Sequence, residues 1–131
     1  MAITFDNALG VHQHTVGVRG KRAETLSSNI ANANTPGYKA QDIDFQRALK
    51  AASSEANIGL SRTNERHIAA STRVMGEKKY RVPSQPDTGD GNTVDAQLEK
   101  NLFMQNALEY QASLDFLGSK FKNMKKALNG K

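Results

Sequence analysis

The sequence predicts a mainly α-helical protein, in which long N- and C-terminal helices form an antiparallel, coiled-coil-like pair beside a small irregular middle segment that contains some β-structure. Apolar residues recur at alternating spacings of four and three near both ends of the chain, which is the period of a helix with one apolar stripe. All three prolines lie between residues 36 and 86, outside both periodic segments. With 131 residues, 37% of them hydrophobic, the chain has room for one domain with a lean core.

The first helix is expected between Thr4 and Ala33. Its stripe has nine positions, of which seven are apolar and two, His12 and Arg19, are polar. Pro36 ends the helix, because proline cannot continue the hydrogen-bond ladder, and Gly37 permits a turn. The stripe positions are Phe5, Leu9, His12, Val16, Arg19, Ala23, Leu26, Ile30 and Ala33.

The last helix is expected from about Thr93 to Leu128, and its stripe has no polar interruption. Asn92 or Thr93 is expected to cap its start. Lysines crowd its end, where cations suit the negative pole of a helix dipole. At about 1.5 Å per residue the helix would be about 50 Å long. The stripe positions are Phe103, Ala107, Tyr110, Leu114, Leu117, Phe121, Met124 and Leu128.

The segment between the two helices follows neither period. A short helix is expected from Asp42 to Ala51. Short strands are expected from Ile58 to Thr63 and from Lys79 to Val82, where polar and apolar residues alternate. The predicted division of the chain is therefore an N-terminal helix (1–35), a middle segment (36–92) and a C-terminal helix (93–131).

The two long helices are predicted to need partners beyond each other. Ordering a helix costs backbone entropy at every residue, whereas a bare helical hairpin buries only one side of each stripe and leaves the flanking apolar edges in water. The lean supply of apolar residues offers little further interior. The missing contact surface is therefore expected to come from other chains.

The charge of the chain leaves a rival interpretation open. The formal net charge is +5, and residues 120–131 hold five lysines and no acid. A small basic helical protein that binds nucleic acid would have such a charge. The helix-dipole explanation is favoured, because a general nucleic-acid surface spreads its cations along a whole face.

Few residue patterns indicate chemistry. The chain has no cysteine, which excludes disulfides, thiolate metal sites and a cysteine nucleophile. His12 and His14 are two apart, so on a helix they point away from each other and cannot share a metal. The run from Asp87 to Asn92 lacks the alternating acids and closing glutamate of a calcium loop. We therefore expect no enzyme activity, no cofactor and no metal.

Three asparagines near the end of the first helix, Asn29, Asn32 and Asn34, allow two interpretations. They can cap the helix and form the turn, since asparagine bonds local backbone groups and tolerates left-handed angles. They can also fix the register between packed helices, as a polar residue does in a coiled coil. The first interpretation is favoured.

The segment LSSNIANANTPGYK, residues 26–39, closely resembles the N-terminal signature of the flagellar rod, hook and hook-associated axial proteins. Segments 38–45, 80–95 and 110–124 look like the short proximal rod subunits in particular. Gln41 departs mildly from the pattern, since arginine is common there. The related short proximal rod protein FlgC is the nearest alternative. The matched signature positions are Asn29, Ile30, Ala31, Asn32, Asn34, Thr35, Pro36, Gly37, Tyr38 and Lys39.

This resemblance implies a structural subunit of the proximal rod of the bacterial flagellar basal body. Its terminal helices would self-assemble into the inner layer of a drive shaft that transmits torque and encloses the export channel. The implied location is the periplasm, reached through the flagellar type III export apparatus without a cleaved signal peptide. The implied partners are further copies, rod proteins of the FlgC and FlgF types, the rod adapter FliE at the membrane ring and the export gate, with no nucleic acid and no small-molecule substrate.

The residues expected to act in this role fall into three sets. The turn set is Asn29, Asn32, Asn34, Thr35, Pro36, Gly37 and Tyr38. Phe45 and Leu49 resemble the Phe-x-x-x-apolar segment that the export gate recognises, although a hydrophobic pair on a short helix explains them equally well. The subunit-packing set is Leu9, Val16, Leu26, Ile30, Phe103, Tyr110, Leu114, Leu117, Phe121 and Met124.

Overall fold

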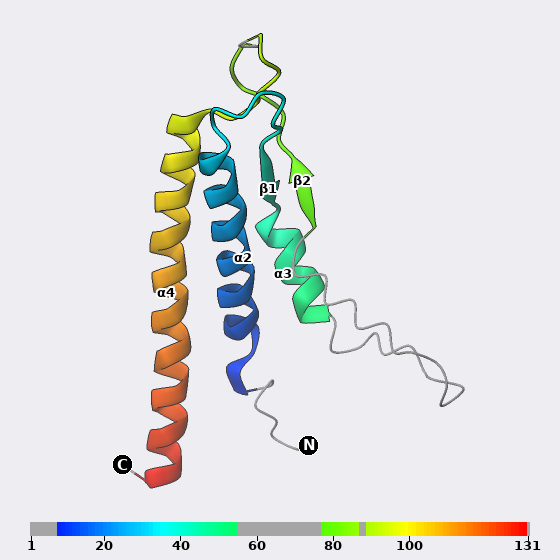
Figure 1. Ribbon diagram of the computed structural model, residues 1–131. Helices are drawn as coiled ribbons and strands as arrows, with labels where there is room; N and C mark the ends of the chain where they lie inside the picture. Colours follow the sequence, from blue (N-terminus) through cyan, green and yellow to red (C-terminus); the bar gives the residue numbers. More distant parts are fainter. Residues whose placement is uncertain (1–7, 55–76, 87–88, 131) are drawn as a thin grey trace, which may run out of the picture.

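The computed structural model describes residues 8–54, 77–86 and 89–130. Two long helices, α2 and α4, run antiparallel side by side, and the remaining elements lie on the side of α2 away from α4 (Figure 1). The predicted mainly α-helical fold with a small β-containing middle is confirmed. In chain order the elements are α2 (Val11–Ala31), β1 (Gln41–Ile43), α3 (Phe45–Ser54), β2 (Lys78–Tyr80) and α4 (Ala96–Asn129).

Helix α2 begins directly after Gly10, whose φ of 56° is incompatible with a right-handed helix. The prediction of one unbroken helix from Thr4 is therefore wrong at Gly10, and its first residues lie outside the described chain. At the other end the backbone N–H of Asn32 donates to the carbonyls of Ser28 and Asn29. The helix thus ends close to the predicted position.

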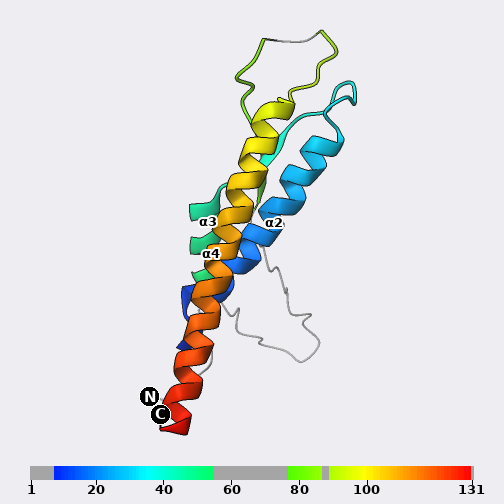
Figure 2. The ribbon, with the colours of Figure 1, turned by 90° about the vertical axis from the view of Figure 1, so that its left-hand side faces the viewer.

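Helix α4 is capped by Asp95, whose side chain accepts hydrogen bonds from the N–H groups of Gln97 and Leu98. The predicted cap at Asn92 or Thr93 is wrong, because those residues contact the end of α2 and the turn that follows it. The helix ends at Gly130 in a left-handed conformation. Its 34 residues make it much longer than α2, and its C-terminal part extends past the start of α2 (Figures 1 and 2).

The middle segment contains one predicted strand and one unexpected one. Strands β1 and β2 pair antiparallel with Asp42 opposite Lys79, so the predicted strand near Lys79 is confirmed. The short helix begins at Phe45 and not at the predicted Asp42, because Asp42 belongs to β1. Helix α3 begins after Asp44, whose Oδ1 accepts from the N–H of Arg47 at 3.1 Å. The predicted strand at 58–63 lies outside the described residues.

The apolar core is small and lies between α2 and the β1–α3 segment. Val18, Ile43 and Ala48 form its buried cluster, and Phe45 packs against it. The buried residues of α4 are instead polar and seven residues apart: Glu99, Asn106 and Ser113. The helix pair is therefore joined along a narrow polar seam. Within the described residues, no helix combines the length and hydropathy that crossing a membrane requires.

Candidate assembly surface and its polar anchor

The exit from α2 is held by a residue from the far end of the middle segment. The last carbonyls of a helix lack partners within the helix. The Asn92 Nδ2 donates to three carbonyls there, those of Asn32, Ala33 and Thr35, at 3.1, 2.9 and 3.0 Å. Its Oδ1 accepts from the Val94 N–H at 2.8 Å. Asn92 therefore caps the C-terminal end of α2. It is distant from that end in sequence and is brought there only by folding.

The turn after α2 lies directly beside residues 90–93. The Gly37 N–H donates to the carbonyl of Asp90 at 2.9 Å, and the Thr93 N–H donates to the carbonyl of Tyr38 at 3.0 Å. Gly37 and Gly91 both have positive φ, and a Cβ on Gly91 would lie 3.7 Å from the Cα of Gly37. Glycine is favoured at both positions because side chains rarely adopt a positive φ, whereas the 3.7 Å contact is ordinary. The turn is thus where the exit from α2 meets the segment that leads into α4.

Asn29 fixes α2 against both β1 and α4. Its side chain is fully buried. The Nδ2 donates to the carbonyl of Gln41 at 2.7 Å and to Oε2 of Glu99 at 3.0 Å, while Oδ1 accepts from the Gln41 N–H at 3.1 Å. The register interpretation therefore describes Asn29. The capping interpretation describes Asn32, whose Nδ2 donates to the Ser28 carbonyl at 2.8 Å.

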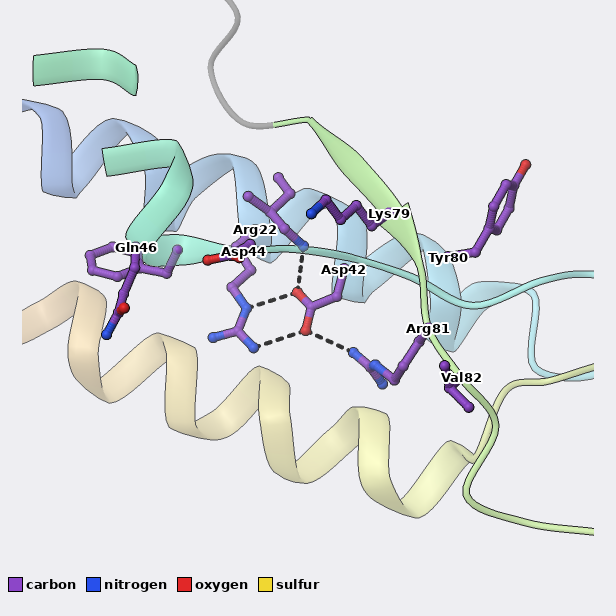
Figure 3. Close-up of a pocket in the computed structure, with 10 residues that line it drawn as sticks. Arg22, Asp42, Asp44, Gln46, Lys79, Tyr80, Arg81 and Val82 are labelled. Atoms are coloured by element: carbon purple, nitrogen blue, oxygen red, sulfur yellow. Dashed lines mark hydrogen bonds and ion pairs between the residues drawn. The ribbon is translucent and has the colours of Figure 1, made fainter. Parts of the chain in front are cut away.

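An ion-pair network continues from Asn29 across α2, β1 and α4. Arg22 of α2 holds the Asp42 carboxylate with two hydrogen bonds of 2.9 Å, and Arg81 donates to the same carboxylate at 2.9 Å. Figure 3 shows Asp42 between the two guanidinium groups. Arg81 also pairs with Glu99, which is 1% exposed. The network links α2, β1, the segment after β2, and α4.

The protonation states in this network favour the ion pairs. Burial of the Asp42 carboxylate raises its pKa. The hydrogen bond and charge of Arg22, the Ile43 N–H and the hydrogen bond from Arg81 together outweigh burial and lower the pKa below its usual value. The hydrogen bond to Asp42 raises the pKa of Arg22 further. Together with other residues these groups line an open pocket of about 520 Å³. Because each of the two arginines is paired with a carboxylate, the pocket is built by structural ion pairs.

A further ion pair joins α2 and α4 nearer to the start of α2. Arg19 of α2 pairs with Glu109 of α4, and its guanidinium lies 4.2 Å from the ring centroid of Phe45. Burial raises the pKa of Glu109, but hydrogen bonds from Gln105 and Arg19 outweigh it and lower the pKa. These contacts explain why a charged residue interrupts the apolar stripe of the first helix.

Comparison with known proteins identifies the family. Residues 19–39 match the family described as Flagella basal body rod protein. The chain is 55% identical over 130 residues to "Flagellar basal body rod protein FlgB" of Aeromonas hydrophila, covering 99% of this chain and 98% of that protein. It is 42% identical over 131 residues to the protein of that name from Escherichia coli K12, covering 95% and 94%. The chain belongs to the FlgB family. It is a structural subunit of the flagellar basal body rod.

The FlgB-family chain buries part of the predicted packing set within itself. Leu9 and Leu26 are buried inside the subunit, and a role for them in subunit packing stays a prediction. The half-buried members are Val16, Ile30, Tyr110, Leu117 and Met124. The exposed members are Phe103, Leu114 and Phe121.

Four further large apolar side chains of α4 are exposed although the packing set omitted them. Met104 and Leu108 lie on the side of α4 that faces away from α2, while Phe116 and Leu128 lie near its C-terminal part. Their exposed fractions range from 61% to 87%. Single exposed apolar residues are common, but several exposed apolar residues on one helix are typical of an interaction surface.

The two residues of the export-gate segment have a structural place in this FlgB-family subunit. Phe45 packs against the apolar cluster and beneath Arg19, and Leu49 of α3 is half-buried. The hydrophobic-pair interpretation therefore describes the folded subunit. Among the described residues, no three side chains of the metal-ligating types lie close enough together to hold a metal ion.

Sequence reasoning missed the residues that anchor the fold. The sequence patterns single out neither Glu99 nor Arg81, and they place Asp42 only at the start of a short helix. One pattern could have found part of the network. Glu99, Asn106 and Ser113 are spaced by seven, which is the spacing of a second, polar stripe beside the apolar one.

Proposed function

We propose that this subunit assembles through its terminal helices into the proximal part of the rod, which serves as a drive shaft that transmits torque and encloses the export channel. The observation that carries the proposal is the exposed stripe of α4. Phe103, Leu114 and Phe121 remain 37%, 36% and 47% exposed after α2 has packed against the helix. Burial of apolar surface drives association, and neighbouring subunits supply the burial that the chain lacks.

The arrangement of the elements supports the proposed division into an inner and an outer part. Residues 1–35 and 93–131 form the inner coiled-coil layer in this proposal, and residues 36–92 lie further out. In support, β1, β2 and α3 lie on the side of α2 opposite α4 (Figure 1), so one side of the helix pair is left for neighbours. The role is mechanical and not catalytic, and the charged side chains of the network support this because they bind one another.

The proposed partners are further copies of the chain, rod proteins of the FlgC and FlgF types, the adapter FliE at the membrane ring, and the export gate. The proposed location is the periplasm, which the chain reaches through the flagellar export apparatus without a cleaved signal peptide. Membership of the FlgB family supports a place in the basal body. The proposed partners are the components that would lie next to the subunit in the basal body.

Deletion of the gene and its complementation test the proposal. The deletion strain is expected to lack rods and hooks and to secrete no later axial proteins, because the shaft cannot extend beyond the missing subunit. Complementation is expected to restore swimming and to place the chain in purified basal bodies. A deletion strain that still builds hooks and swims would overturn the proposed function.

A further inference from the structure

Strand β2 has an edge that faces away from its only strand partner. β1 and β2 form a two-stranded antiparallel sheet, and the Arg81 N–H donates to the Ala40 carbonyl at 2.9 Å. In such a pair, residues that bond across the strands alternate with residues that do not. Tyr80 precedes Arg81 and lies opposite Gln41. The backbone N–H and carbonyl groups of Tyr80 and Gln41 therefore point away from the sheet, on its two opposite edges.

The two edges differ in what they bind. The Gln41 N–H and carbonyl both bond to the Asn29 side chain, at 3.1 and 2.7 Å. The N–H and carbonyl of Tyr80 have no hydrogen-bond partner within residues 8–54, 77–86 and 89–130. Unpaired backbone groups along an edge strand are a template for a further strand. The edge at Tyr80 is therefore shaped to take an extended chain.

Exposed apolar side chains accompany these backbone groups. Tyr80 and Val82 lie two apart, so they share one face of the strand, and they are 73% and 85% exposed. Figure 3 shows the Tyr80 side chain pointing away from the Asp42 network. An edge that only prevents pairing carries charges or proline, whereas aromatic and β-branched residues stabilise cross-strand pairs. The edge thus offers side-chain contacts as well as hydrogen bonds.

Charge indicates which kind of strand can pair with this edge. Lys78 and Lys79 are both exposed, and the carboxylates bound by Arg81 are already shared within the network. A second copy that paired antiparallel about Tyr80 would place its Arg81 directly opposite Lys79. Like charges in that position are destabilising. The edge therefore disfavours a second copy and favours an acidic strand from a different protein.

We propose that the free edge of β2 is the docking site for an extended acidic segment of a different protein on the outside of the rod. The segment adds as an antiparallel strand, so that it meets Val82 and Tyr80 first and Lys79 and Lys78 last. Its sequence therefore reads apolar, any residue, apolar, acidic, acidic. The proposal rests on the proposed rod function, in which residues 36–92 lie outward, and it specifies the chemistry of what they meet there.

Photocrosslinking in basal bodies tests the docking site. A benzophenone amino acid replaces Tyr80 in one full-length variant and Lys50, an exposed residue of α3, in a control. Each variant is expressed in the deletion strain, irradiated and purified with the basal bodies, and the crosslinked peptides are sequenced. The probe at residue 80 is expected to capture a segment of a different protein with the predicted order of apolar and acidic residues. The probe at residue 50 is expected not to capture that segment.

The outcomes separate the docking proposal from the rod function. If the chain is present in basal bodies, the docking proposal is overturned by the absence of a crosslink, by a crosslink to a second copy, or by a captured segment without adjacent acidic residues. Absence of the unsubstituted chain from basal bodies overturns the rod function and the docking proposal with it.

A proline at residue 80 tests whether the backbone edge is used. Tyr80→Pro removes an N–H that β1 does not bind, so the β1–β2 hydrogen bonds are retained. Tyr80→Val keeps the N–H and is the matched control. With the benzophenone probe in place of Val82, Tyr80→Pro is expected to lower the crosslink yield about fivefold, as for one lost hydrogen bond. Tyr80→Val should lower it by less than about twofold. Equal yields overturn docking through strand addition.

Charge reversal tests the acidic character of the segment and does not depend on the proline variant. With the same probe, Lys79→Glu is expected to lower the crosslink yield about fivefold, because two like charges would face each other across the strands. Lys50→Glu makes the same change of charge at an exposed position of α3 and should lower the yield by less than about twofold. Equal yields for the two variants overturn the acidic assignment.

Discussion

The two halves of α4 differ in what they bury. In the first half, residues 96–113, the buried side chains are Glu99, Asn106 and Ser113, and the first two are hydrogen-bonded to other elements of the chain. In the second half, residues 114–130, no side chain is buried, although six large apolar residues lie there. The buried side chains of α4 are thus polar, and the large apolar side chains of its second half lie outside the buried interior of the subunit.

This difference follows from the directionality of the two kinds of interaction. Hydrogen bonds and ion pairs require a particular geometry, so the network around Asn29 and Asp42 accepts only one register of α2 against β1 and α4. Apolar burial has no direction, and an exposed stripe can take any helix of suitable shape. A subunit whose own register is fixed by polar groups can therefore present its stripe to neighbours in one defined position.

Phe121→Asp is expected to have the largest effect on assembly, because it places a charge in the exposed stripe and changes no buried residue. We expect loss of incorporation into basal bodies and loss of swimming, whereas the free energy of unfolding of the isolated subunit changes by less than about 0.5 kcal/mol. The control is Ser119→Asp, which adds the same charge two residues away on the opposite side of α4. Normal swimming of the Phe121→Asp strain would show that the exposed second half of α4 is not needed for assembly.

Glu99→Ala is expected to destabilise the subunit by about 2–4 kcal/mol, because it leaves the partly buried Arg81 and the buried Asn29 amide without their shared partner. Urea unfolding followed by circular dichroism measures the change. Glu24→Ala removes an exposed glutamate of α2 that pairs with its neighbour Lys21 on the same helix, and is expected to cause no measurable change. Similar stabilities for the two variants would show that the network does not anchor the fold.

Asn92→Ala is expected to lower the free energy of unfolding by about 1–3 kcal/mol, because three carbonyls at the end of α2 lose their donor. Amide hydrogen exchange in the last turn of α2 should accelerate more than exchange in the middle of α4. The matched variant is Asn34→Ala, which changes an exposed asparagine of the same turn. If Asn34→Ala proved as damaging as Asn92→Ala, the capping role of Asn92 would be wrong.

Asp42 is expected to give the subunit an acid-sensitive stability, the smallest of these effects. Its pKa is lower in the folded chain than in the unfolded chain, where a free aspartate has a pKa of about 3.9. The ion pairs therefore stabilise the fold fully above that pH, and the stabilisation is lost as the pH falls through the folded value. Asp42→Asn should be about 1–2 kcal/mol less stable at pH 7 and should lose less stability between pH 5 and pH 3. Parallel curves for the two proteins would contradict this.

The sequence predicts the two long helices well, but it does not predict the polar network or the helix caps. The four-and-three spacing locates both long helices, because a stripe pattern is a local property of consecutive residues. Gly10 shows the limit of that reasoning, since the stripe spacing continues through a residue whose backbone leaves the helix. The cap was also misplaced, because Asn92, Thr93 and Asp95 are all suitable capping residues and only the folded chain engages Asn92 and Thr93 elsewhere.

The sequence by itself determined two long amphipathic helices, the turn between Asn32 and Tyr38, a surplus of lysine at one end and too little apolar surface for a self-contained core. Only the tertiary structure decided which stripe of α4 faces α2. The apolar stripe was the expected choice, yet the polar stripe with Glu99 and Asn106 occupies the seam. The physical reason is that a buried carboxylate or amide is tolerated only when it is paired, and its partners Arg81, Asn29 and the Arg19 carbonyl are brought within reach only by folding.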